Sequence, residues 1–418
     1  MKPLVLGLDL GTSGVRAAVL NATGQLLHTS STTYTRGLPH AEDWSQACRD
    51  LILGIPETLR SQLRAMAVDG TSGTLLACRA DGSPIGQALP YFQACPEQSE
   101  LLRALVPATS PAASNSGSLA RALQLLQQIP GENLLRHQAD WINGWLLQDW
   151  RWGEEGNNLR LGWNPQQGNW DGAIAQQHWA PALPSIKPSG TVLGCINSHL
   201  AVELGLSLEL MVVAGTTDSN AAVLAADPGE ADGVTVLGTT LVMKRFTARP
   251  LFAPGITNHR VGGRWLCGGA SNSGAGVLRR FFNDSQLREL SRQIDPESSS
   301  GLRYVPLPGK GERFPVDDPG LMPVLEPRPV SDALFLHGLF EGLAAIEAQG
   351  WKRLEELGAE PPKRVISLGG GARNPQWRRL RERRLGCPVR SCTLPPAAGV
   401  ARLALQALHK GESTQQHR

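Results

Sequence analysis

The stretch that decides the fold is Leu6–Leu27, which reads LGLDLGTSGVRAAVLNATGQLL. Two apolar runs flank a polar, glycine-containing turn, so the stretch predicts two strands joined by a tight bend. One carboxylate, Asp9, stands at the end of the first apolar run. Because an unpaired charge in an apolar strand carries a large desolvation penalty, we expect Asp9 to have a partner.

The turn after Asp9 has the composition of a phosphate-binding loop. Gly11, Thr12 and Ser13 supply unhindered backbone amides and two hydroxyls, which bind an oxyanion at close range. A carboxylate and a phosphate can share this space when a magnesium ion, reached directly or through water, lies between them. The stretch therefore suggests a nucleotide site, and a plain hairpin with a capped turn is the alternative.

The whole chain limits the class of protein. Its 418 residues suggest two or three domains, and 40 basic against 37 acidic side chains give neither a nucleic-acid nor an anionic-membrane signature. Seven scattered cysteines lack zinc-ligand spacing. The start of the chain does not resemble a secretory signal, and no apolar run reaches the roughly 18 residues of a membrane helix. These features predict a cytoplasmic protein.

Two later stretches repeat the opening pattern. AVDGTSGTLLAC at residues 67–78 and GVTVLGTTLVMKRF at residues 233–246 each lead from an apolar strand through a small polar turn into a second strand. Helical apolar spacing covers residues 44–63. This alternation predicts an α/β protein. The turn DPGE predicts the crossing between two domains, residues 1–228 and 229–418.

Two segments, one rich in tryptophan and one rich in arginine, each have a structural and a functional interpretation. Seven of the eleven tryptophans lie between Trp141 and Trp179, and sugars stack on aromatic faces. Trp141 and Trp145 are nevertheless four apart on an apolar helical stripe, so we expect core packing. The arginine-rich stretch at residues 373–384 predicts a solvated helix face.

Six motifs in order carry a resemblance to a known family. They are LDLGTSGVR, DGTSGT, AGTTDSNAAV, LGTTLVMK, GGASNSGAG and LGGGARN, beginning at residues 8, 69, 214, 237, 268 and 368. The chain resembles the FGGY carbohydrate kinases of the actin-like ATPase superfamily, most of all the short cyanobacterial and plant pentulose kinases. The resemblance implies two ribonuclease H-like α/β domains flanking a deep cleft, the first mainly for sugar and the second mainly for ATP.

The resemblance also assigns the reacting groups. Asp218 matches the family's catalytic aspartate, which accepts the proton of the sugar alcohol, and capping of the following helix is its alternative role. Asp9 is expected to orient magnesium, directly or through water, and the phosphoryl group. The two phosphate loops take in the following residues: Gly11, Thr12, Ser13 and Arg16 in the first, and Gly238, Thr239 and Thr240 in the second.

The sugar and nucleotide sites follow from the same resemblance. The sugar is expected on Asp69, Thr71 and Ser72, whose polar groups would reject analogues that lack a hydroxyl; turn capping is their alternative role. Arg121 stands where many family members have a lysine. The nucleotide loops contribute Gly268, Gly269, Asn272, Gly370, Gly371 and Asn374, for which hinge glycines are the alternative.

The expected ligands are ATP, Mg²⁺ and a small sugar, with no nucleic acid or membrane. The resemblance points to D-ribulose, phosphorylated at carbon 5. D-xylulose kinase, glycerol kinase and a weakly active sugar or nucleotide sensor are the alternatives, and the motif order disfavours a polymer or chaperone ATPase. The long insertions of larger relatives are absent, which favours a monomer.

Overall fold

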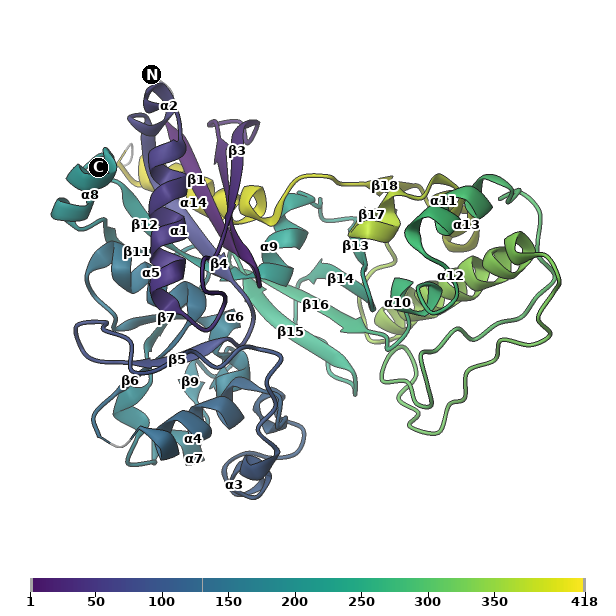
Figure 1. The fold of residues 1–418 in the computed structure, drawn as a ribbon, viewed down its shortest axis with the longest axis horizontal. Coiled ribbons are helices and arrows are strands. Elements are labelled where there is room, and N and C mark those ends of the chain that lie inside the picture. Colours follow the sequence, from purple (N-terminus) through teal and green to yellow (C-terminus); the bar gives the residue numbers. More distant parts are fainter. Residues whose placement is uncertain (1–2, 130, 416–418) are drawn as a thin grey trace. The chain divides into compact units, whose positions relative to one another are not determined.

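The structure is a computed structural model that describes residues 3–129 and 131–415, and they form two compact units (Figure 1). Within the described residues, unit 1 runs to Ala225 and adds His259–Gly263 and the segment from Leu394 onward. Unit 2 consists of Ala226–Asn258 and Arg264–Thr393. The segment from Leu394, which the sequence-based division placed in the second domain, thus groups with unit 1.

Unit 1 is built on a six-stranded sheet. In sheet order its strands are β11 (Val192–Cys195), β12 (Met211–Thr217), β4 (Leu63–Gly70), β1 (Leu4–Leu10), β2 (Gly14–Leu20) and β3 (Leu26–Thr33). The first three strands of the chain form an antiparallel meander, and β4 and β12 continue the sheet parallel to β1. Every residue of β1 is buried, as its unbroken apolar run predicts for a central strand.

Two pairs of helices pack on this sheet. They are α1 (Ala41–Gly54) with α5 (Gln138–Leu147), and α9 (Asp218–Ala225) with α14 (Pro396–Gln415). Successive side chains of a strand point to opposite faces, so Leu6 and Leu8 join the core cluster with Trp44 of α1, while Gly7 faces α14. A Cβ at Gly7 would lie 1.9 Å from the carbonyl oxygen of Ala397, so α14 packs directly on the backbone of β1.

A long insertion between β4 and β12 forms its own small core within unit 1. Trp141 and Trp145 of α5 belong instead to the main core, with 5% and 8% of their surface exposed. The ring of Trp44 meets Trp141 edge-on at 5.9 Å. The predicted packing role of these two tryptophans is confirmed.

The insertion and its flanks contain α2 (Glu57–Arg60), β5 (Leu75–Cys78), α3 (Ser99–Leu105), α4 (Ser118–Gln128), β6 (Leu134–His137), β7 (Trp152–Glu154), α6 (Glu155–Asn158), β8 (Trp163–Asn164), β9 (Asn169–Trp170), α7 (Gly172–Ala175), β10 (Ser185–Lys187) and α8 (Ser198–Leu204).

Unit 2 repeats the central strand order of unit 1, but the two sheets differ at their edges, because unit 1 has the strand β11, which runs antiparallel to β12. Its sheet runs β15 (Ile256–Val261), β16 (Arg264–Ala270), β14 (Leu241–Thr247), β13 (Asp232–Leu237), β17 (Arg364–Leu368) and β18 (Val389–Ser391). As in unit 1, antiparallel strands occupy one side of the first strand, and strands parallel to it occupy the other. The predicted α/β repeat is therefore confirmed.

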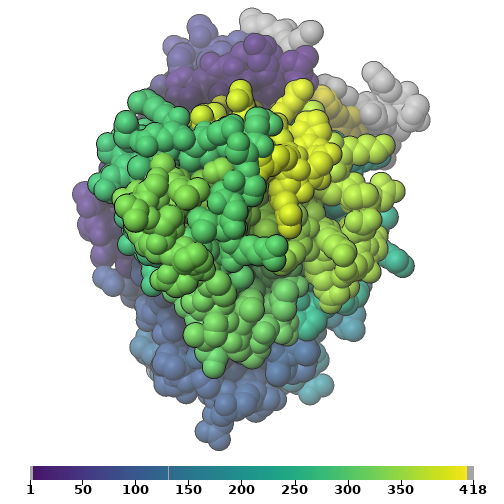
Figure 2. Space-filling model, turned by 90° about the vertical axis from the view of Figure 1, so that its right-hand side faces the viewer, coloured from purple at the N-terminus to yellow at the C-terminus, as the bar shows by residue number. Residues whose placement is uncertain are grey.

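The helices of unit 2 are α10 (Ala275–Leu278), α11 (Asp284–Arg292), α12 (Asp332–Glu356) and α13 (Pro375–Leu385). The last three pack on one another, and the rings of Phe340 and Trp377 stack at 5.1 Å between α12 and α13. Figure 2 looks onto unit 2, whose green residues face the viewer. A single helix-rich core therefore supports the loops at the ends of β13 and β17.

The arginine-rich helix α13 is only partly solvated. The prediction of a solvated face is wrong for Arg381, which is 1% exposed and donates to both carboxylate oxygens of Glu347, at 2.6 and 2.8 Å. Its third contact is the Ser367 hydroxyl, at 2.7 Å, and Thr235 donates to the same carboxylate at 2.6 Å. This network ties α12 and α13 to β13 and β17.

We expect Glu347→Gln to lower the free energy of unfolding by about 3–5 kcal/mol, because the substitution leaves the buried guanidinium of Arg381 without its counter-charge. Glu356→Gln is the matched control, since Glu356 forms an exposed ion pair with Arg353 at 3.4 Å and such pairs contribute about 0–1 kcal/mol. Chemical denaturation compares the two variants. Equal losses would show that the buried network contributes no more than a surface pair.

Two further features concern the cysteines and the possibility of a membrane-spanning helix. All seven cysteines are free. In the described ranges, no helix is both long enough and apolar enough to pass through a lipid bilayer.

Candidate active site

Three aspartates lie at the carboxyl ends of three neighbouring parallel strands in unit 1. Asp9 and Asp69 are register partners on β1 and β4, and Asp69 is in register with Thr216 on β12. Asp218 follows β12 directly as the first residue of α9. Ligands of open α/β sheets bind at this edge. The fold therefore gathers three acids from far apart in the sequence.

Asp9 has the partner that its position in an apolar strand requires. Its carboxylate is 2% exposed, and Arg16 Nη1 donates to Oδ2 at 3.1 Å. The turn between them is closed by the Gly11 amide, which donates to the carbonyl of Gly14 at 2.9 Å. Thr12 and Ser13 at the tip are exposed. The first predicted phosphate loop is thus an accessible turn held at its base.

Asp69 is the most deeply buried of the three acids. It is 0% exposed, and neither of its carboxylate oxygens meets a hydrogen-bond donor among the described residues. Burial, and then the negative charges of Asp9 and Asp218, raise the pKa of Asp69 well above its usual range. The carboxylate of Asp9 lies within hydrogen-bonding reach of this carboxyl. The three acids therefore form one electrostatic group.

Asp218 lies at the start of α9 with its carboxylate partly accessible. Its Oδ1 accepts the amide of Ser219 at 2.7 Å, which is a local contact at the start of α9. The side chain is half-buried, and its charge acts on Asp69. A carboxylate in this position is accessible to a hydroxyl and can accept its proton.

The other predicted sugar residues differ in their availability. Thr71 is 2% exposed; its hydroxyl donates to Gln138 Oε1 at 2.7 Å and lies 2.6 Å from the hydroxyl of Thr74. Ser72 is half-buried next to it. Thr71 therefore holds the loop, while Ser72 is the residue of this turn that is placed to meet a ligand.

Two residues hold this turn in place: Gln138, which sequence reasoning did not select, and Arg121, which it noted only as a replacement of the family's usual lysine. Gln138 accepts from the amide and hydroxyl of Thr71 and donates to the hydroxyl of Tyr34 at 3.1 Å. Arg121 donates to the carbonyl oxygens of Gly73, at 2.7 Å, and of Gln93, at 2.7 Å. Burial lowers the pKa of Arg121 to about 10. Both side chains fix the conformation of the turn that contains Thr71.

We expect Arg121→Lys to raise the KM for the sugar and lower the melting temperature. An ammonium group cannot replace the planar fork that binds several carbonyls at once, and each buried carbonyl left unpaired costs about 1–3 kcal/mol. Steady-state kinetics and thermal unfolding measure both effects. Arg103→Lys, on the exposed face of α3, is the control and should change neither quantity. Normal values for Arg121→Lys would refute the supporting role.

A buried polar edge next to α9 was also missed from the sequence. Glu154 accepts the amides of Gly156 and Asn157 at 2.8 and 2.9 Å and so begins α6. A Cβ at Gly156 would lie 3.6 Å from the side-chain nitrogen of Asn220 on α9. Asn157 is 2% exposed, and neither atom of its amide group has a hydrogen-bond partner in the described ranges. Such groups are the kind that a hydroxylated ligand satisfies.

The second predicted phosphate loop lies in unit 2, between β13 and β14. The amide of Ala275 donates to the carbonyl of Gly238 at 2.9 Å, and that of Gly276 donates to Thr239 at 3.1 Å. Thr239 is exposed and Thr240 half-buried. The loop is thus anchored on the start of α10 and presents its threonines at the surface of the unit.

The predicted nucleotide residues before α10 have packing contacts of their own. A Cβ at Gly268 would lie 1.9 Å from the carbonyl oxygen of Met243, and one at Gly269 would lie 2.4 Å from the ring of Phe314. Asn272 donates to the carbonyl of Gly311 at 3.0 Å. These close approaches explain why the positions are glycines without reference to a ligand.

The loop after β17 contains both packed and open positions. A Cβ at Gly371 would meet the ring of Trp377 at 2.4 Å, whereas one at Gly370 would have nothing within 4 Å. Asn374 Oδ1 accepts the Trp377 amide at 2.9 Å, and its Nδ2 donates to Ser291 at 2.7 Å. Gly370 is therefore the position of this loop at which a ligand can approach the backbone.

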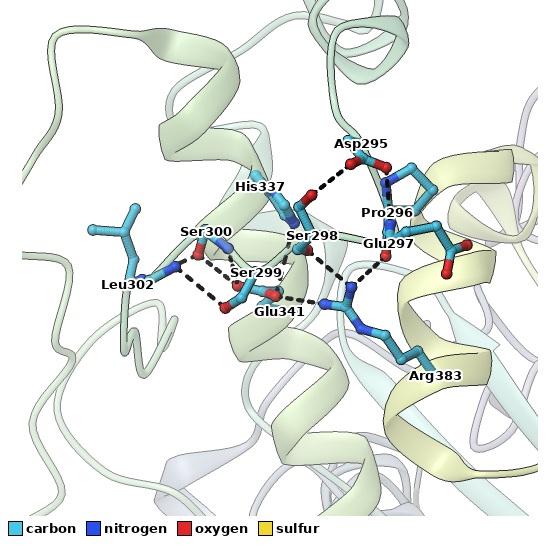
Figure 3. Close-up of polar contacts among 11 residues, drawn as sticks. Asp295, Pro296, Glu297, Ser298, Ser299, Ser300, Leu302, His337, Glu341 and Arg383 are labelled. Atoms are coloured by element: carbon cyan, nitrogen blue, oxygen red, sulfur yellow. Dashed lines mark hydrogen bonds and ion pairs between the residues drawn. The ribbon is translucent and has the colours of Figure 1, made fainter.

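Unit 2 also contains a cavity of about 590 Å³ beneath the segment that follows α11. Arg383 of α13 and Glu341 of α12 line it, joined by an ion pair of 2.8 Å (Figure 3). Arg383 also donates to the carbonyl of Ser298, and Ser300 donates to Glu341 (Figure 3). Since no predicted site residue lines this cavity, we assign it to the anchoring of the segment.

The acids of unit 1 bear on the expected magnesium ion. Among the described residues, no group of three or more histidine, cysteine or acidic side chains is arranged around one ion position. Magnesium, however, is usually held by one or two carboxylates together with water and substrate phosphates. Asp9 and the orphaned carboxyl of Asp69 fit that requirement.

Comparison with known proteins identifies the family. Residues 233–408 match the C-terminal domain of the FGGY family of carbohydrate kinases. The match covers the C-terminal part of the chain and identifies that part as a domain of this family. Together with the relatives that follow, this match supports an ATP-dependent carbohydrate kinase. Its relatives include the xylulose kinase of Lactococcus lactis, 24% identical over 89% of this chain and 81% of that one, and the xylulose kinase of Escherichia coli, 24% identical over 98% and 91%.

Solved structures place this FGGY kinase in the actin-like fold. A xylulose-type kinase from Brucella ovis, 18% identical, gives a TM-score of 0.81 over 97% of this chain and 91% of that one. Plasmodium falciparum glycerol kinase with ADP, 14% identical, gives 0.82 over 98% and 90%. At this identity the likeness shows the fold alone. The predicted fold, two actin-like α/β domains, is confirmed.

Proposed function

We propose that this kinase phosphorylates a pentulose, with D-ribulose favoured and D-ribulose 5-phosphate as product. The observation that carries the proposal is the convergence of Asp9, Asp69 and Asp218 at one sheet edge, beside an exposed oxyanion-binding turn. D-xylulose is the second candidate, because two curated relatives are xylulose kinases.

Asp218 is the proposed base. It accepts the proton of the terminal hydroxyl as the sugar oxygen forms a bond to the γ-phosphorus, and the bond from that phosphorus to the bridging oxygen breaks and releases ADP. The half-buried carboxylate keeps access to a bound sugar while its backbone contact at Ser219 holds its orientation. The hydroxyl thus loses its proton as the bond between the sugar oxygen and the γ-phosphorus forms.

The phosphate groups are assigned to the two polar turns. Thr12, Ser13 and Arg16 of unit 1 would bind the transferred phosphoryl group, and Gly238, Thr239 and Thr240 of unit 2 would bind the remaining phosphates. We propose that unit 2 holds the nucleotide, with Gly370 as the point of closest backbone approach. A magnesium ion held at Asp9 would supply compensation for the charge of the phosphates.

The sugar is assigned to unit 1. Ser72 is only half-buried. The side-chain amide of Asn157 is buried and has no hydrogen-bond partner among the described residues. Both lie close to elements that bear the reacting acids, the first after β4 and the second beside α9. A site of this kind discriminates strongly among sugars by their hydroxyl pattern.

A coupled assay of ADP release tests the proposal, with MgATP and D-ribulose, D-xylulose, L-ribulose, glycerol or no sugar. We expect the highest kcat/KM with D-ribulose. Preference for D-xylulose would establish the second candidate. Sugar-independent hydrolysis alone would reject a pentulose substrate.

A further inference from the structure

The buried carboxyl of Asp69 is the polar group in unit 1 that the proposed reaction leaves unexplained. Its surface is 0% exposed, and neither oxygen finds a donor among residues 3–129 and 131–415. A buried carboxyl group without a hydrogen-bond partner is costly in its neutral form and more costly when ionised. The protein keeps it at the centre of its candidate site, so a ligand is the natural partner.

The charged side chains near Asp69 do not supply that partner. Arg16, whose side chain is 53% exposed, donates to Asp9 Oδ2, and its positive charge affects Asp69 less than the negative charges of Asp9 and Asp218 do. The nearest groups, Asp9 and Asp218, are themselves acids and act against a second negative charge. A positive charge from outside the chain would relieve the whole group at once.

We propose that Asp69 is the second protein ligand of a divalent cation that Asp9 also binds. This inference rests on the proposed kinase activity, because the cation is the one that accompanies ATP. It replaces the sugar-binding role expected for Asp69 from the sequence. It also assigns the Asp9 and Asp69 carboxylates, and not Asp218, to the ion, so that Asp218 keeps its role as base.

The strand register supports this assignment. Asp9 and Asp69 are direct partners on parallel neighbours, so their side chains leave the sheet on the same side. Neighbouring strands are about 4.8 Å apart, which lets two carboxylates approach one hard cation or the water molecules in its shell. Two carboxylates with water and phosphate oxygens make up a usual magnesium environment. The hydroxyl-rich turn after Asp9 is then placed to add the phosphate.

The test measures binding of Mn²⁺ alone to the full-length protein, without ATP or sugar. Free Mn²⁺ is followed by electron paramagnetic resonance, and the melting temperature is recorded with and without Mg²⁺. The variants are Asp69→Asn and Asp9→Asn, with Asp81→Asn as the control, since Asp81 is an exposed turn residue whose carboxylate accepts the amide of Ser83. Circular dichroism verifies that each variant is folded.

We expect wild type and Asp81→Asn to bind Mn²⁺ equally and to gain thermal stability from Mg²⁺. Asp69→Asn and Asp9→Asn should each weaken Mn²⁺ binding about tenfold or more, as loss of a metal-supporting group does. Unchanged Mn²⁺ affinity in Asp69→Asn would overturn the proposal, and so would weakening in Asp9→Asn alone. Because no turnover is involved, failure here is distinguishable from failure of the kinase assay.

Discussion

Asp218→Asn is expected to lower kcat by roughly 10²–10⁴-fold, the usual contribution of a positioned general base. The amide has nearly the shape of the carboxylate, and its oxygen can still accept the Ser219 amide, so α9 should retain its first contact. What the variant loses is the ability to take a proton. The affinity for ATP, measured by calorimetry, should therefore remain at the wild-type value.

The control for Asp218 is Asp284→Asn. Asp284 is likewise the first residue of a helix, α11, and is exposed, so this variant reproduces the change in charge at a helix start without touching the three acids. It should retain wild-type turnover. If both variants lose activity equally, or if Asp218→Asn keeps most of its kcat, the capping role of Asp218 is sufficient and the base lies elsewhere.

Asp9→Asn is expected to abolish measurable turnover without lowering the melting temperature. The carboxylate of Asp9 is paired with Arg16, half of whose side chain is exposed, and such pairs add about 0–1 kcal/mol to stability. Against this small loss, the substitution removes a negative charge that acts on the buried Asp69. The neutral amide therefore relieves part of the repulsion among the three acids in the protein without ligands.

Single-turnover kinetics and thermal unfolding separate the two effects of Asp9→Asn. Lost turnover together with an unchanged or raised melting temperature supports a role in the reaction. A melting temperature that falls together with the activity would instead identify Asp9 as a structural residue of β1. Leu6→Ala serves as the comparison, since removing a fully buried leucine from the same strand costs about 2–5 kcal/mol.

The sequence was informative where chemistry and local pattern coincide. The apolar run of β1 predicted a buried strand, and the acid that interrupts such a run had to have a partner, which Arg16 provides. Asp218 stood between an apolar strand and an apolar helix, and this is where the structure has it. Short-range patterns of this kind need no knowledge of the rest of the chain.

The residues that escaped prediction depend on contacts between distant segments. Gln138 looks like an ordinary helical residue, and the sequence marked Arg121 only as a substitute for lysine; the folded chain brings both to the turn that contains Thr71. Arg381 belongs to a strongly basic stretch, so its burial depends on Glu347, which another helix supplies. Gly269, in the strand Arg264–Ala270, has a similar explanation. Its backbone packs against the ring of Phe314, which lies far away in the sequence.

The position of α14 affects the order in which the kinase is made. This helix covers the backbone of β1 in unit 1, yet it follows unit 2 along the chain. On the ribosome, the strands that carry Asp9 and Asp69, and the strand that precedes Asp218, therefore emerge long before the helix that covers β1. Chains synthesised at about 5–20 residues per second must keep that apolar surface exposed while unit 2 is translated. The three acids are therefore encoded within the first 218 residues, but the sheet that carries Asp9 and Asp69 is covered only after α14 has been made.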